Sequence, residues 1–502
     1  MRVSFATVAA AAARLGSTQL RRTTLALLSA RIVSALSTLV VLAFLARARG
    51  IDALGIGSLG VVTGTIMATL TEAGTNSLLI REIARSRHGS AALLTSILAL
   101  RAITLPACIL VSIPLFALAF GSTGQLVLLF GLAFVIQQFG ELDRAIMLAV
   151  NRPYVVAAHG IVENAVWAAV TVLALAQGAD LYVAATLGLA VMILSALGGA
   201  CLAFAWGVKP GSATLADCRR AARLALPFLG YSVVMVAAFR LDTVLVSLLV
   251  PSGIAAAGAY FAATRLIASA EYLPESLSRA AYPDLSRRSA SPDGQVHDIM
   301  RPATRDLLRL SLPIPIALLC GGSAVLPLIF GPELAPYAWI LTVLGFAIPA
   351  RFLCILFGVS LTSANAQGRR VAITAVAVVC GQGLDLLLLP FIGVPAAVAA
   401  SIVTTILLLI PYTREVWQRF GKPIRLSDVL VPLGCACVAA VPALGLRVLL
   451  GGPDRPLEFA ASMVVYGVGY LAAMLSMPAA QAAWRRMRGG PGALANARET
   501  RS

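Results

Sequence analysis

Charged side chains interrupt segments of this sequence that are otherwise apolar. The clearest case is the stretch VAAFRLDTVLVSLLV, Val236–Val250, in which Arg240 and Asp242 stand among hydrocarbon side chains. Arginine can bind phosphate groups through two parallel hydrogen bonds, and a carboxylate in such surroundings can carry a proton or a cation. The same interruption recurs along the chain at Arg31, Glu72, Arg101, Glu163, Arg265, Glu271, Glu275, Arg351 and Asp385.

The spacing of Arg240 and Asp242 prevents them from neutralising each other, because residues two apart point to different sides of a helix. At roughly 2.5 to 3.5 kcal/mol per charge in the middle of a membrane helix, the five arginines would cost on the order of 15 kcal/mol. Interhelical ion pairs would remove this cost for single residues. Charges spread over so many segments are explained better by a hydrated cavity between two groups of helices.

We therefore expect one set of residues to line a central cavity: Arg31, Arg101, Arg240, Asp242, Arg265 and Arg351. A second set is expected either to couple to H⁺ or Na⁺ or to serve as arginine partners: Glu72, Glu163, Glu271 and Asp385. No metal site is expected, because the three histidines are far apart in the chain and Cys435 and Cys437 lack a metal-binding spacing. No catalytic residue or cofactor is expected either.

The elements that must position these residues are membrane helices. The chain has 502 residues, of which 59% are hydrophobic and only 12% are charged, and its mean hydropathy is +0.90. These values lie outside the range of soluble globular proteins. Apolar runs of roughly 20 residues, the length of a membrane-spanning helix, predict an all-α polytopic protein with about 14 transmembrane helices.

The order of the connectors predicts the orientation of the chain. The expected helices begin near Leu25, Ile56, Ala92, Gly124, Tyr154, Leu181, Leu224, Ala255, Asp306, Ala335, Val371, Pro395, Leu426 and Phe459. Alternate connectors are rich in basic residues, among them Arg81, Arg85, Arg144, Arg152, Arg219, Arg220, Arg287, Arg288, Arg369 and Arg370. Because basic connectors stay in the cytoplasm, both termini are expected to be cytoplasmic.

A faint internal repeat divides the chain into halves. The stretches GIDALGIG from Gly50 and GIAAAGAY from Gly253 share both glycines and an isoleucine, and the same offset places Glu72 on Glu275. Two parallel six-helix lobes are therefore expected. The expected segments are a cytoplasmic tail at 1–24, an N-lobe at 25–208, a cytoplasmic linker at 209–223, a C-lobe at 224–420, a helix pair at 421–484 and a cytoplasmic tail at 485–502.

The net charge of +17 does not indicate a nucleic-acid partner. The basic residues are scattered over short connectors and do not form one stripe with interleaved aromatic residues. The expected surroundings of the chain are the lipid bilayer.

Two stretches resemble a known family. LTEAGTNSLLIREIAR, Leu70–Arg85, and the segment from Phe239 to Arg287 are similar to the polysaccharide-flippase branch of the multidrug/oligosaccharidyl-lipid/polysaccharide (MOP) exporter superfamily. The matching residues are Glu72, Gly74, Arg81, Glu82, Arg85, Arg240, Asp242, Gly258, Tyr260, Arg265 and Pro283. The resemblance implies a two-lobed, V-shaped fold in a bacterial inner membrane and alternating access.

The resemblance also implies a substrate, an undecaprenyl-pyrophosphate-linked oligosaccharide that is flipped from the cytoplasmic to the outer leaflet for surface polysaccharide synthesis. Other polysaccharide-assembly proteins are then expected as partners. The expected arginines suit this substrate, since a pyrophosphate binds arginine forks and the glycan requires a wet cavity. The alternatives left open are a lipid II flippase, a drug or cation antiporter of the same superfamily, and a membrane glycan polymerase or ligase. The last would be an enzyme, whereas flipping breaks no bond.

Overall fold

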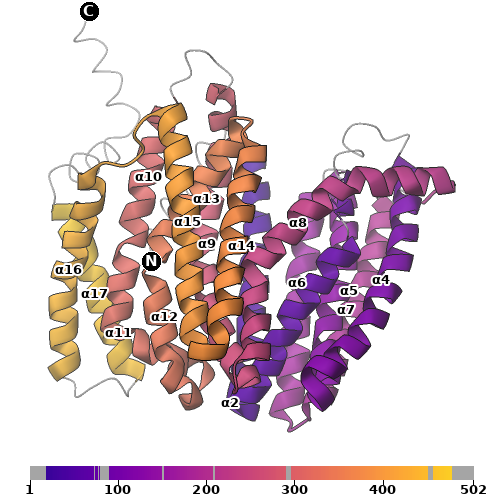
Figure 1. The fold of residues 1–502 in the computed structure, drawn as a ribbon, viewed down its shortest axis with the longest axis horizontal. Helices are drawn as coiled ribbons and strands as arrows, with labels where there is room; N and C mark the ends of the chain where they lie inside the picture. The colour runs from indigo at the N-terminus through magenta and orange to yellow at the C-terminus, as the bar shows by residue number, and fades with distance from the viewer. Residues whose placement is uncertain are drawn as a thin grey trace, which may run out of the picture.

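The chain folds into long helices, as the computed structural model shows in Figure 1. The structure describes residues 18–72, 74–76, 78–79, 90–149, 152–206, 210–289, 296–449 and 456–476. No β-strand occurs among these residues. The prediction of an all-α membrane protein is confirmed, because the helices are long and apolar enough to cross a membrane.

The N-lobe begins with a helix that reverses direction. α2 (Thr18–Glu72) breaks at Gly50, whose φ of 84° lies in the left-handed region that glycine adopts without strain. A Cβ added to Gly57 would approach the side chains of Leu42 and Leu45, so the two arms of α2 pack against each other. The lobe continues through α4 (Ser90–Phe120), η1 (Gly121–Thr123), α5 (Gly124–Ala149), α6 (Pro153–Ala176) and α7 (Leu181–Trp206).

The C-lobe forms the second group of helices in Figure 1, and two more helices follow it. Its elements are α8 (Leu215–Leu249), α9 (Gly253–Ser289), α10 (His297–Ser311), α11 (Pro313–Phe330), η2 (Pro332–Tyr337), α12 (Ala338–Gly345), α13 (Ile348–Ser363), α14 (Gln367–Ile392) and α15 (Val394–Phe420). The final pair is α16 (Leu426–Leu449) and α17 (Pro456–Ser476), which pack against each other beside α10 and α11.

Ten helices of the described residues, or eleven if one bent pair is a single span, are long and apolar enough to cross a membrane. Dividing two of these long segments brings the count close to the expected number of about 14. α2 and the α4–α5 segment each supply two, divided at Gly50 and at η1. α10 with α11 forms one crossing, and η2 and α12 with α13 form another that bends by 47°. α6, α7, α9, α14, α15, α16 and α17 supply one each. α8, at 35 residues, is long enough to be a further crossing. The break between α12 and α13 lies within the run from Ala335 to Ser363.

The two lobes lean apart toward the upper side of Figure 1 and meet at the lower side, where α2 reverses. At this meeting point α2 and α9 approach closely through glycines. A Cβ on Gly55 would lie 2.1 Å from the carbonyl oxygen of Ile254, and one on Gly258 would lie 2.7 Å from the Cα of Gly55. Only glycine permits this approach. Gly55 and Gly258 are the pair that the internal repeat relates.

Contacts of the α2 reversal with the C-lobe reinforce this junction. Arg47 donates its Nε–H to the carbonyl oxygen of Ile329 at 2.9 Å and also hydrogen-bonds that of Leu328. The backbone N–H of Ile51 donates to Oε2 of Glu333 in η2 at 2.7 Å. The lobes are therefore held together by polar bonds and close backbone packing at the end opposite the basic connectors.

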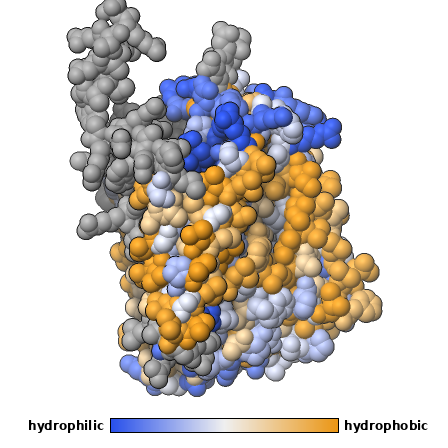
Figure 2. Space-filling view, turned by 90° about the vertical axis from the view of Figure 1, so that its left-hand side faces the viewer, coloured by the Kyte–Doolittle hydropathy of each residue, from blue (hydrophilic) through white to orange (hydrophobic). Residues whose placement is uncertain are grey.

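The outer surface fits a bilayer. Figure 2 shows an apolar belt on the side of the C-lobe, below hydrophilic residues that gather at the upper end. Large apolar side chains that point outward include Leu118, Val379, Phe391, Val441 and Val448. Because exposed apolar area of this extent is unfavourable in water, these faces belong in lipid.

Candidate functional site

The first part of the site is a pair of cations on neighbouring helices, α8 and α9. Arg240 and Arg265 are both partly exposed, and their positive charges repel each other. The guanidinium of Arg240 lies 6.0 Å from the ring centroid of Phe261, at the outer limit of a cation–π contact. Neither arginine forms an ion pair with an acidic residue in the part of the chain described. Together they can accept an anion with two or more negative oxygens.

Asp242 lies beside these arginines but is held by a different neighbour. The hydroxyl of Tyr260 donates to Oδ2 of Asp242 at 2.8 Å, and the backbone N–H of Thr243 donates to Oδ1 at 2.7 Å. Asp385 of α14 is buried and acts electrostatically on Asp242. The Oδ1 atom of Asp385 has no hydrogen-bond partner among the described residues. The carboxylates of Asp242 and Asp385 therefore lie near enough for their negative charges to repel each other.

Arg351, in contrast, is neutralised within the C-lobe. One guanidinium nitrogen lies 3.0 Å from Oε1 of Glu271, and the other donates to the hydroxyl of Ser401 at 2.8 Å. The side chains of Arg351 and Glu271 are mostly buried. The prediction that Glu271 acts as an arginine partner agrees with this geometry, and Arg351 then ties α13 to α9 and α15.

Arg31 reaches from the N-lobe to the C-lobe. Its guanidinium lies 3.4 Å from Oε2 of Glu275, and about half of the Arg31 side chain, 52%, is exposed. Since an exposed pair at this distance is weak, Arg31 can exchange Glu275 for an anionic ligand at little cost.

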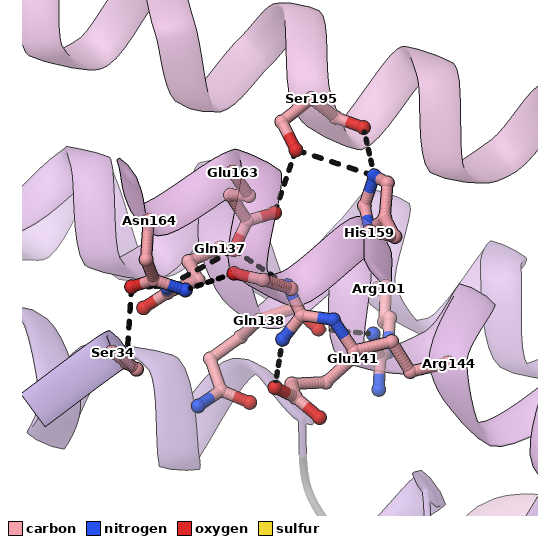
Figure 3. A network of polar contacts seen from close by, with 11 residues as sticks. Ser34, Arg101, Gln137, Gln138, Glu141, Arg144, His159, Glu163, Asn164 and Ser195 are labelled. Carbon is pink, nitrogen blue, oxygen red and sulfur yellow. Dashed lines mark hydrogen bonds and ion pairs between the residues drawn. The ribbon is translucent and has the colours of Figure 1, made fainter. Parts of the chain in front are cut away.

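A buried polar network occupies the N-lobe (Figure 3). Its centre is Glu163 on α6, whose side chain is only 1% exposed. Glu163 accepts hydrogen bonds from Arg144 at 2.5 Å, from Gln137 at 3.1 Å and from Ser195 at 2.7 Å. The network extends to Ser34, Glu141, His159 and Asn164. It joins α2, α5, α6 and α7 inside one lobe.

Arg101 belongs to the interior of this lobe, which corrects the expectation that it lines the cavity. Arg101 is 1% exposed. It donates to the hydroxyl of Thr75 at 3.0 Å, to the amide oxygen of Asn76 at 2.7 Å and to the carbonyl oxygen of Gln138 at 3.3 Å. Glu72 lies near enough to attract it. The donors of Arg101, on α4, are used to hold the residues that follow α2 and the backbone of α5.

Arg144 was also placed wrongly by the sequence, which put it in a cytoplasmic connector. α5 continues to Ala149, so Arg144 lies inside a helix and turns toward α6. The apolar stretch AIMLAV that follows it was the available signal, because it shows that the helix does not end at Arg144. The partners Tyr260 and Ser401 carried no separable signal, since hydroxyl groups are common in membrane helices.

The comparisons with known proteins agree with this architecture. Residues 20–288 match the family model described as polysaccharide biosynthesis protein. The chain belongs to the polysaccharide biosynthesis protein family. No curated protein sequence matches the chain significantly.

Among solved structures, this family member is similar to "Lipid II flippase MurJ, inward closed conformation", at a TM-score of 0.72 and 14% identity over 89% of this chain and 97% of that one. It is also similar to an inward-facing multidrug resistance MATE family transporter of the MOP superfamily. The TM-score is 0.58 and the identity 13%, over 77% of this chain and 94% of that one. A MOP superfamily transporter from Pyrococcus furiosus matches with a TM-score of 0.53 and 13% identity, over 79% of this chain and 95% of that one. The chain therefore shares its fold with these three transporters.

In this polysaccharide biosynthesis protein the expected site residues separate into groups. Arg240, Arg265 and Asp242 come together on α8 and α9, with Asp385 close to Asp242. Arg31 lies across from α9. Arg101 and Glu163 serve the interior of the N-lobe instead. Within the described residues, no group of three or more His, Cys, Asp or Glu side chains is placed to hold a metal ion.

Replacing Arg144 by alanine is expected to destabilise this family member by about 3 to 5 kcal/mol, because Glu163 would remain buried without its charged partner. Thermal unfolding of the detergent-solubilised protein measures this effect. Replacing both residues by apolar ones, Arg144→Met with Glu163→Leu, should restore most of the stability. The matched control is Arg287→Ala, whose ion pair with Asp284 is exposed and should contribute less than about 1 kcal/mol. Equal stability of Arg144→Ala and Arg287→Ala would contradict a structural role for the network.

Proposed function

We propose that this protein flips an oligosaccharide linked to a polyprenyl pyrophosphate from the cytoplasmic to the outer leaflet of a bacterial inner membrane. The observation that carries the proposal is the pair Arg240 and Arg265, two neighbouring guanidinium groups without an acidic ion-pair partner among the described residues. Keeping such a pair in membrane helices is unfavourable unless an anion occupies it for part of the cycle. A pyrophosphate offers the required oxygens and charge.

The remaining groups fit into a transport cycle. The lobes touch through Gly55 and Gly258 at one end and lean apart at the other, which supports alternating access with the basic, cytoplasmic side open. Arg31 supplies a third cation from the opposite lobe. The pair Asp242 and Asp385 is the proposed place of H⁺ or Na⁺ coupling, since a bound cation would remove their mutual repulsion. With the basic connectors in the cytoplasm, both termini are cytoplasmic as well. The substrate is moved without breaking any of its bonds. Polysaccharide-assembly proteins then use the flipped product.

A lipid II flippase is the second candidate, because the flippase MurJ shares the fold over nearly the whole chain. The two candidates differ in the glycan and not in the pyrophosphate. Deleting the gene in its own host separates them, with the lipid-linked precursors analysed in cells with and without a plasmid copy. We expect polyprenyl-pyrophosphate oligosaccharide to accumulate and surface polysaccharide to disappear, both reversed by the plasmid. Accumulation of lipid II would favour the second candidate, and unchanged pools of both precursors would overturn flipping of either.

A further inference from the structure

A second basic site lies away from the charged residues discussed above, between the neighbouring helices α14 and α15. It is a pocket of 260 Å³ near the start of α14 and the end of α15. Its lining residues are Arg369, Ile373, Pro411, Arg414, Glu415 and Gln418. Since a water molecule in the liquid takes up ~30 Å³, the pocket is large enough for a polyatomic group. The proposed transport function makes no use of it.

The charge of this pocket is positive. Glu415 is buried, and its two carboxylate oxygens lie 2.7 Å from Nε of Arg369 and 3.4 Å from Nε of Arg419. Two arginines thus share one carboxylate. Arg414 adds a further cation, and it forms no ion pair with any residue that the structure describes. An anion can therefore enter without displacing Glu415 from its partners.

The surroundings of the pocket are those of a membrane surface. Along α15, Ile406, Ile410 and Arg414 follow each other at intervals of four, so they share one face of the helix. The two isoleucines are exposed, by 45% and 62%. Trp417 is also exposed, and the Nζ of Lys422 lies 5.0 Å from the centre of its ring. Apolar residues that give way to arginine, tryptophan and lysine mark the level of lipid head groups.

We propose that this pocket binds the phosphate head group of an anionic membrane lipid in the cytoplasmic leaflet. Arg414 and the outward-facing nitrogens of Arg369 hold the phosphate, and the acyl chains lie along Ile406 and Ile410. The proposal depends on the cytoplasmic placement of the basic connectors and is independent of the substrate that is flipped. Such a lipid would fix the depth of α14 and α15 in the membrane.

Quenching of Trp417 fluorescence by brominated lipids tests this site. The purified full-length chain is placed in phosphatidylcholine nanodiscs that contain a fixed fraction of brominated phosphatidylglycerol or of brominated phosphatidylcholine. The signal of Trp417 is obtained as the difference between the native chain and Trp417→Phe, because the chain has five tryptophans. We expect brominated phosphatidylglycerol to quench Trp417 several times more strongly, and the preference to weaken as salt is raised.

Arg414→Gln is the decisive variant, since Arg414 has no ion pair whose loss would disturb the fold. Its preference for the anionic lipid should fall about fivefold, the change that corresponds to about 1 kcal/mol per basic residue at a membrane surface. The matched control, Arg220→Gln, removes an exposed arginine from α8 and should keep the preference. Equal quenching by both lipids, or an equal loss in both variants, would overturn the site. Displacement of the lipid by millimolar inorganic pyrophosphate would overturn the lipid assignment in favour of a soluble phosphate compound.

Discussion

Replacing Arg240 or Arg265 by alanine is expected to lower polysaccharide export by about tenfold or more, because each loses a charge-assisted contact with the pyrophosphate of about 1.5 to 3 kcal/mol. Arg240→Lys should keep the charge but lose the two-pronged geometry, and so give an intermediate level. The measurement is complementation of the deletion strain, with surface glycan and the amount of protein in the membrane determined together.

The stability of these variants distinguishes binding from a structural role. Arg240 and Arg265 repel each other, so removing one should leave thermal stability unchanged or slightly raised. Arg223→Ala on the same helix is the matched control, since Arg223 is exposed near the start of α8, and it should export normally. Alanine variants that insert normally and export at the native level would show that neither arginine binds substrate.

The second large effect is expected at the junction of the lobes. Gly55→Val should abolish export while the protein still inserts, because its Cβ would lie 2.1 Å from the carbonyl oxygen of Ile254 and would hold α2 and α9 apart. Overlap of this kind costs about 1 to 3 kcal/mol or more, which shifts a two-state equilibrium by about fivefold to more than a hundredfold. The conformation that is closed at this end would then be depleted.

Accessibility of engineered cysteines measures this shift in membranes. A thiol at Ile51, beside the junction, should react faster with an impermeant reagent in Gly55→Val than in the native background, after the natural cysteines are replaced. Gly198→Val is the control, because an added Cβ at Gly198 meets no atom within 4 Å. Full export by Gly55→Val would mean that the contact of Gly55 with Ile254 is not part of the transport cycle.

Hydropathy was sufficient to predict the helices, with the largest errors where a helix leaves the membrane. α16 begins at Leu426 and α7 at Leu181, as expected from the apolar runs. α8 begins at Leu215, nine residues before the expected Leu224, because its first turns are polar. They are stabilised by a capping box, in which Thr214 and Asp217 bond each other's backbone N–H at 3.2 Å and 2.9 Å.

The site could be predicted only in part, because a charge in an apolar helix shows that a partner is needed and not which one. Arg101 and Arg240 are both single arginines in apolar stretches of the sequence. In the structure, however, Arg101 hydrogen-bonds Thr75, Asn76 and Gln138 within its own lobe. The direction in which a helix face points is decided by packing between distant segments. The repeat located Gly55 and Gly258, but their mutual contact became visible only in the folded chain.

Flipping of the lipid-linked oligosaccharide can be measured in vesicles that contain the purified chain. Vesicles contain a polyprenyl-pyrophosphate oligosaccharide, and an impermeant enzyme modifies only the glycans on the outer surface. With the native chain we predict that the modified fraction of glycan rises beyond the fraction that is exposed at the start. In vesicles with the double variant Arg240→Ala and Arg265→Ala, the modified fraction should stay at the starting value. An inner pool that stays unmodified with the native chain would contradict flipping by this protein. Movement at the native rate by the double variant would contradict binding of the pyrophosphate by these arginines.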